Sequence, residues 1–92
     1  ELIDSAPDSD TMGRLGDTIS GTSGVRAFHA LRVRKVGGRL CLDVHVLVDP
    51  ALSVVEGHDL ATEVRRRLLE CECLVVDAIV HVEPDERGAV ST

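Results

Sequence analysis

The sequence has almost no aromatic residues: its 92 residues include one Phe and no Trp or Tyr. A hydrophobic fraction of 43% is still enough for one small domain, whose core must be built from Val, Leu, Ile and Ala. Proteins that bind single-stranded DNA or RNA stack the bases on aromatic side chains. The shortage of aromatics and a net charge of -6 therefore argue against a function in nucleic-acid binding.

Cysteines, long apolar runs and catalytic motifs are also scarce. Three cysteines, an odd number, do not make a disulfide framework and fit a reducing cytosolic setting. No apolar run approaches the roughly 20 residues that a membrane-spanning helix needs. The chain has no G-x-S-x-G motif, phosphate-binding loop or paired-carboxylate signature. We therefore expect that it is not an enzyme.

The first half of the chain contains the patterns of one helix and two strands. A helix is expected up to about Ser20, with Ser9 or Asp10 as its N-cap. Alternating apolar residues then predict strands over 25–36 and 39–48. The two glycines between them predict a tight hairpin turn, because glycine readily adopts the positive φ that such a turn requires.

The second half predicts one more helix and one more strand. Ser53 and Glu56 have the spacing of a capping box, so a helix should begin there and run to about Glu70. A last strand is expected over 74–82 and stopped by Pro84. The order helix, strand, strand, helix, strand indicates an α+β two-layer sandwich, related to the split-βαβ, ferredoxin-like plan but lacking its first strand.

One domain accounts for this order of elements. We expect it to span 9–84. The acidic, proline-containing segment 1–8 has the composition of a linker, and 85–92 that of a flexible tail.

The four histidines of the chain are the main candidates for metal binding. A strand pairing counted from the Gly-Gly turn sets His29 opposite Val46, on the face covered by the helices. The second helix, which carries His58, begins at that end, so the two side chains could meet. A lone histidine in a strand is usually an ordinary residue, and no compact motif such as H-E-x-x-H is present. However, all four histidines are predicted to lie near one end of the fold, and this grouping is harder to ascribe to chance than the position of any one of them.

The opposite face of the predicted sheet carries the other candidates. A helical crossover makes the last strand parallel to the middle one, which puts His45 and His81 at a similar depth. His81 and Glu83 share one side of their strand and are close enough to bind one ion. Nitrogen and carboxylate ligands suit zinc or a similar divalent ion. His29 and His58 fall on the other face of the predicted sheet. All the candidates can then be ligands only if two subunits share a site, if the hairpin contains a bulge, or if two separate ions bind.

The cysteines at positions 71 and 73 form a second candidate site. Two cysteines one residue apart can chelate a soft ion such as Cu(I) or Zn(II). The competing interpretation treats Cys71 and Cys73 as small hydrophobic residues at the end of a helix and the start of a strand. If the cysteines are the primary site, the chain is a stand-alone metallochaperone-like module.

Several motifs in order carry a resemblance to a known family. The stretch GVRAFHALRVRKVGGRLCLDVHVLVDPALSVVEGHDLATEVRRRL, followed by DAIVHVEPDE, resembles the C-terminal cytoplasmic domain of cation diffusion facilitators, which are divalent metal cation/proton antiporters. The likeness covers about Gly24 to Pro84, and the segment 1–8 resembles the joint after the last membrane helix.

The resemblance implies a metallochaperone-like αββαβ fold and a V-shaped homodimer. In zinc-transporting members the metal ligands match His29, His45, His58 and His81, together with a carboxylate at Glu83. Metal binding is then expected to close the V and to promote transport by the membrane domain of the same chain. The expected ion is Zn2+, or else Fe2+, Mn2+, Co2+ or Ni2+. The implied location is the cytoplasmic side of a membrane, in particular a bacterial inner membrane. The competing functions are the stand-alone cysteine module and a domain for dimerisation alone.

Overall fold

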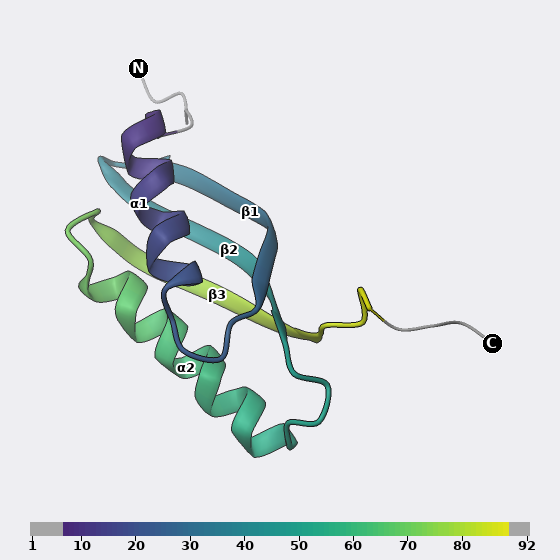
Figure 1. Cartoon of the computed structure of the whole chain (residues 1–92). Coiled ribbons are helices and arrows are strands. Elements are labelled where there is room, and N and C mark those ends of the chain that lie inside the picture. Colours follow the sequence, from purple (N-terminus) through teal and green to yellow (C-terminus); the bar gives the residue numbers. More distant parts are fainter. Residues whose placement is uncertain (1–6, 89–92) are drawn as a thin grey trace.

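The computed structural model describes residues 7–88, which form two layers: two helices packed on one face of a three-stranded sheet (Figure 1). The elements are α1 (Ser9–Ser20), β1 (Ala27–Val36), β2 (Arg39–Val48), α2 (Val54–Glu70) and β3 (Val75–Pro84). The predicted α+β class and the predicted order of elements are confirmed. The rest of the predicted linker and tail, 1–6 and 89–92, lies outside the described residues.

Both helices begin at a residue whose side chain caps them. The N-cap of α1 is Asp8, not the predicted Ser9 or Asp10, and its carboxylate accepts a hydrogen bond of 2.8 Å from a backbone N–H in the first turn. The N-cap of α2 is Ser53, as predicted. Its hydroxyl accepts from the Glu56 N–H at 3.0 Å, and the Glu56 carboxylate accepts from the Ser53 N–H at 2.8 Å. Neither helix of the described chain has the length and apolar content required to cross a bilayer.

The core lies between the helices and the inner face of the sheet. Its buried residues come from all elements except β1: Leu15, Ile19, Leu40, Leu42, Val44, Val46, Val48, Val64, Leu68, Val75 and Ala78. Every second residue of β2 points into this core, so the residues between them, which include His45, point to the other face. No described helix covers that open face (Figure 1).

A bulge in β1 changes the predicted register. From the two-glycine turn the pairing runs as predicted as far as Arg32. Between His29 and Arg32, β1 then contains one extra residue, and His29 pairs with His45 instead of the predicted Val46. Ala30, inside this bulge, has a φ of 55°. A shift of one residue exchanges the two faces of a strand. The predicted placement of His29 on the helix-covered face is therefore wrong.

Packing of the only phenylalanine accounts for the bulge. With the shift, Phe28 lies opposite the buried Val46 and packs against the core. Gly16 of α1 leaves room for it, because a Cβ at this position would lie 3.3 Å from the Phe28 ring. Full burial of a phenylalanine side chain contributes about 1.5 to 3 kcal/mol, and the partly buried Phe28 gains part of this. The same shift that turns Phe28 inward turns its neighbour His29 outward.

The pairing of β2 with β3 is parallel, as predicted from the helical crossover. His45 lies opposite His81, which confirms that the two are at the same depth. The strand β3 ends at Pro84, two residues beyond the predicted end, so Glu83 also belongs to it and lies opposite Leu47. The last part of the sheet thus carries candidate ligands on three adjacent strands.

Candidate metal centre

His45 is at the centre of the candidate site, on the middle strand of the open face. Its two strand partners at this level are His29 on β1 and His81 on β3. The centroid of the His45 ring is 5.2 Å from that of His29 and 4.5 Å from that of His81. Three imidazoles therefore lie side by side across the sheet.

Glu83 contacts two of these imidazoles. The Nε2 atom of His29 lies 3.0 Å from Oε1 of Glu83, and Nδ1 of His45 contacts the other carboxylate oxygen. Hydrogen bonds from His29 and then from His45 hold the pKa of Glu83 below its ordinary value. The carboxylate is therefore ionised at neutral pH, and it has ring nitrogens on either side. A divalent cation binds the neutral form of imidazole and the ionised form of a carboxylate, so binding releases any extra protons that these groups hold.

The candidate ligand atoms form two groups of three among the described residues. The atoms of His29, His45 and Glu83 all lie within 4.8 Å of one another, and so do those of Asp43, His45 and His81. Ligands about 2 Å from a zinc ion lie within about 4 Å of one another, so small side-chain movements suffice to bind an ion. The donor set of imidazoles and carboxylates fits a divalent cation. His45 belongs to both groups.

Asp43 is a candidate ligand that the sequence prediction did not include. It lies two residues before His45 on β2, so the alternation of a strand places both side chains on the open face. That spacing was the available signal. The Arg32 guanidinium lies 3.8 Å from the Asp43 carboxylate, at the side of the site nearest the bulge. An ion bound to the second group would compete with this guanidinium for Asp43.

Solvent has access to the site from the open face. The side chains of His29, Glu83 and His45 are 53%, 37% and 30% exposed, respectively. An ion can therefore reach these ligands without local unfolding.

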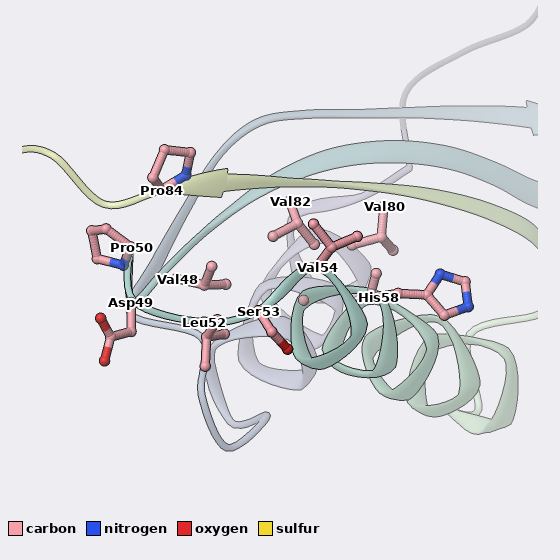
Figure 2. Close-up of a pocket in the computed structure, with 12 residues that line it drawn as sticks. Val48, Asp49, Pro50, Leu52, Ser53, Val54, His58, Val80, Val82 and Pro84 are labelled. Atoms are coloured by element: carbon pink, nitrogen blue, oxygen red, sulfur yellow. The ribbon is translucent and has the colours of Figure 1, made fainter.

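His58 lies apart from both groups of candidate ligands. It is on the second turn of α2 and lines a cavity of about 530 Å³ beneath the end of β3, together with apolar residues such as Val48 and Val82 (Figure 2). His29 points to the opposite face of the sheet. The sequence suggested that His58 and His29 could meet. Within one chain, the structure instead places them on opposite sides of the sheet.

The cysteines of the described chain belong to neither group. Cys41, Cys71 and Cys73 are free thiols, each partly exposed. Cys41 is on the open face of β2, and the other two follow α2 at the far end of the sheet.

Comparisons with known proteins show which proteins this chain resembles. Residues 7–85 match the family described as "Cation efflux protein, cytoplasmic domain". The chain is 38% identical over 82 residues to metal tolerance protein 2 of Oryza sativa subsp. japonica. It is 31% identical over 83 residues to the cation-efflux pump FieF of Pectobacterium carotovorum subsp. carotovorum. The two alignments cover 89% and 90% of this chain but only 21% and 27% of those relatives.

Solved structures resemble the fold over most of its length. A histidine-to-alanine variant of the MamM C-terminal domain has a TM-score of 0.79 and 25% identity, with 84% of this chain and 96% of that chain covered. A histidine-to-aspartate variant of the same domain, described as a cadmium form, also has a TM-score of 0.79 and 25% identity, with 84% and 95% covered. These similarities confirm the metallochaperone-like αββαβ fold.

Proposed function

The chain belongs to the family of cation efflux protein cytoplasmic domains, and from this premise we propose that it is the regulatory and dimerisation domain of a divalent metal cation efflux transporter. The observation that carries this proposal is the convergence of His29, His45 and Glu83 on the open face of the sheet. The named relatives are an efflux pump and a metal tolerance protein several times longer than this chain, which favours a domain of a larger transporter over a stand-alone cysteine module.

The proposed ligand of the site is a cytosolic divalent cation, with Zn2+ as the first choice. Zinc accepts imidazole nitrogen and carboxylate oxygen together and has no strict geometric demand. Fe2+, Mn2+, Co2+ and Ni2+ accept the same donors, and the affinity of such sites generally rises along the series from Mn2+ to Ni2+. His29, His45 and Glu83 would hold one ion, and His81 and Asp43 are placed to bind beside it.

The proposed consequence of binding is closure of a V-shaped homodimer. Each chain carries a formal charge of -6, so two chains repel, and bound cations reduce that repulsion. Closure also requires that the ion bind the closed dimer more tightly than the open one. A ligand from the second protomer would supply this difference in affinity. His58, which lies away from the site in its own chain, is the proposed contributor.

The transport step itself would belong to a membrane domain of the same chain, with this domain on the cytoplasmic side of a bacterial inner membrane. The reading frame that precedes residue 1 should then encode several hydrophobic spans. A reading frame without them would overturn the transporter assignment but leave the metal site open to test.

The site can be tested by calorimetric titration of the domain with zinc. His45→Ala removes a ligand from both groups and should abolish tight binding. Cys41→Ser, on the same strand and the same face, is the matched control and should bind as the wild type does. Equal zinc affinity in wild type and His45→Ala would reject the proposed site.

The role of His58 needs a measurement of assembly as well. Small-angle scattering should show that zinc makes the wild-type dimer more compact, and that His58→Ala binds zinc but closes less. Equal compaction of both proteins would exclude His58 as the contributor from the second protomer.

A further inference from the structure

The loop between α2 and β3 carries two cysteines that the metal centre on the open face does not use. Cys71 is the C-cap residue of α2, and Cys73 follows after one residue. Both pack against the hydrophobic core, whereas Glu72 between them is exposed. The two thiols therefore lie on the same, inner side of the loop.

Backbone hydrogen bonds hold this loop at both ends. The N–H of Cys71 donates to the Arg67 carbonyl at 3.0 Å, and the Leu74 carbonyl accepts from the N–H of Leu40 at 2.9 Å. Leu74 also has a φ of 61°, a left-handed conformation that turns the chain sharply into β3. A loop fixed in this way presents its side chains in a defined arrangement, so little conformational entropy is lost when they bind.

The two thiols, two residues apart, both lie against the core, and the pKa of Cys73 reflects its neighbours. Burial raises the pKa of the Cys73 thiol, and a hydrogen bond with the Cys71 thiol raises it further. Arg14 of α1 approaches Cys73 and acts in the opposite direction. The Cys71 thiol also donates to the Leu68 carbonyl at 3.2 Å. Both sulfurs are thus beside the core yet partly exposed, so an ion can reach them from solvent.

We propose that Cys71 and Cys73 form a second metal site, specific for a soft monovalent cation of the Cu(I) class. Thiolate sulfur is the donor that Cu(I) prefers. In the binding step the two S–H bonds break, two Cu–S bonds form and two protons leave to the solvent. The product, one Cu(I) with two thiolates, carries a net charge of -1, which the nearby Arg14 guanidinium offsets.

The surroundings of the pair favour a monovalent soft ion over a divalent one. A structural zinc site needs four protein ligands. Among the described residues, neither cysteine belongs to a group of three candidate ligands. Cu(I) is satisfied by two thiolates in a line, so the pair alone is sufficient for it. The histidine cluster, in contrast, offers the nitrogen and oxygen donors that divalent ions prefer.

The two sites lie at opposite ends of the sheet. Val75, just after the cysteine loop, begins β3, and His81 is six residues further along the same strand (Figure 1). At about 3.3 Å per residue, this separation is about 20 Å. The sites can therefore be occupied and mutated independently, and the cysteine site can fail without consequence for the divalent site.

Anaerobic titration with Cu(I) in competition with bicinchoninate tests the proposal. The wild-type domain should bind one Cu(I), and Cys71→Ser and Cys73→Ser should each lower the affinity at least about 100-fold, the upper limit for the loss of a group that only supports a ligand. Cys41→Ser and His45→Ala are the controls and should retain wild-type affinity. Circular dichroism establishes that each variant is folded.

The same titration can overturn the proposal in two ways. Equal Cu(I) affinity in the wild type and in the double variant of Cys71 and Cys73 would exclude the pair as the site. An equal loss in Cys41→Ser would show that Cu(I) binds to any accessible thiol. Arg14→Gln provides a further check, because loss of the neighbouring cation should weaken Cu(I) binding several-fold while zinc binding is unchanged.

Discussion

Replacement of Ala30 by glycine should stabilise the domain. Ala30 has a φ of 55° and an exposed side chain, so the substitution removes backbone strain and few contacts. The left-handed conformation costs a residue other than glycine about 1 to 2 kcal/mol. Glycine loses more chain entropy on folding than alanine, which offsets about 0.4 to 1 kcal/mol. The expected net gain in unfolding free energy is therefore about 0.5 to 1 kcal/mol.

Urea unfolding of the metal-free domain, at one fixed protein concentration, measures this gain as a higher midpoint with an unchanged slope. Ala30→Val is the matched opposite, because a β-branched residue tolerates a positive φ poorly and should lower the midpoint. Zinc affinity should be the same in Ala30→Gly and wild type, since His29 keeps its position. A midpoint that falls in Ala30→Gly would refute the left-handed bulge, and with it the reason why His29 faces the open side.

Three further predictions concern the metal centre, pH and the core. In calorimetry, His45→Ala should weaken zinc binding more than His29→Ala or His81→Ala, because each of the latter two removes a ligand from only one group. Equal losses of affinity in the three variants would contradict the shared role of His45. The backbone hydrogen bond at the cap of α1 lowers the pKa of Asp8 below its ordinary value of 3.8. The stabilisation by the ionised Asp8 carboxylate is therefore complete well above pH 3.8, and it is lost as the pH falls through the lowered pKa of the folded state. The difference in urea midpoint between wild type and Asp8→Ala should therefore shrink from about pH 5 downward, and a constant difference would reject the cap. Leu68→Ala, at a fully buried position, should lower the unfolding free energy by about 3 kcal/mol in the same assay, and a loss below about 1 kcal/mol would be incompatible with its burial.

The sequence predicted the elements well where the signals are local. The capping box of Ser53 and Glu56 determines the start of α2, and the strict alternation in 39–48 determines which residues of β2 face the core. The two glycines of the hairpin have φ values of 60° and 82°, as the tight turn requires. These features depend on residues a few positions apart, which a pattern of spacing describes completely.

The register of β1 could not be predicted from such local signals. Apolar residues occupy both faces around the bulge, so Ala27, Phe28 and Leu31 permit either alternation. An extra residue with positive φ is usually announced by glycine or asparagine, but here it is Ala30. The choice depends on the space that Gly16 leaves for Phe28, which is known only when α1 is packed on the sheet. The sequence prediction named a bulge, two subunits or two separate ions as ways to explain candidate ligands on both faces, without a means to choose.

The core and the metal centre are consequently linked through two adjacent residues. Phe28 is inside and His29 is outside only in the bulged register, so whatever stabilises one placement also stabilises the other. A ligand that binds only this register stabilises it by RT ln(1 + [L]/Kd), or about 2.7 kcal/mol at a hundred times Kd. That gain exceeds the cost of about 1 to 2 kcal/mol for the left-handed Ala30. Bound metal would thus more than offset the strain in the bulge that creates its own site.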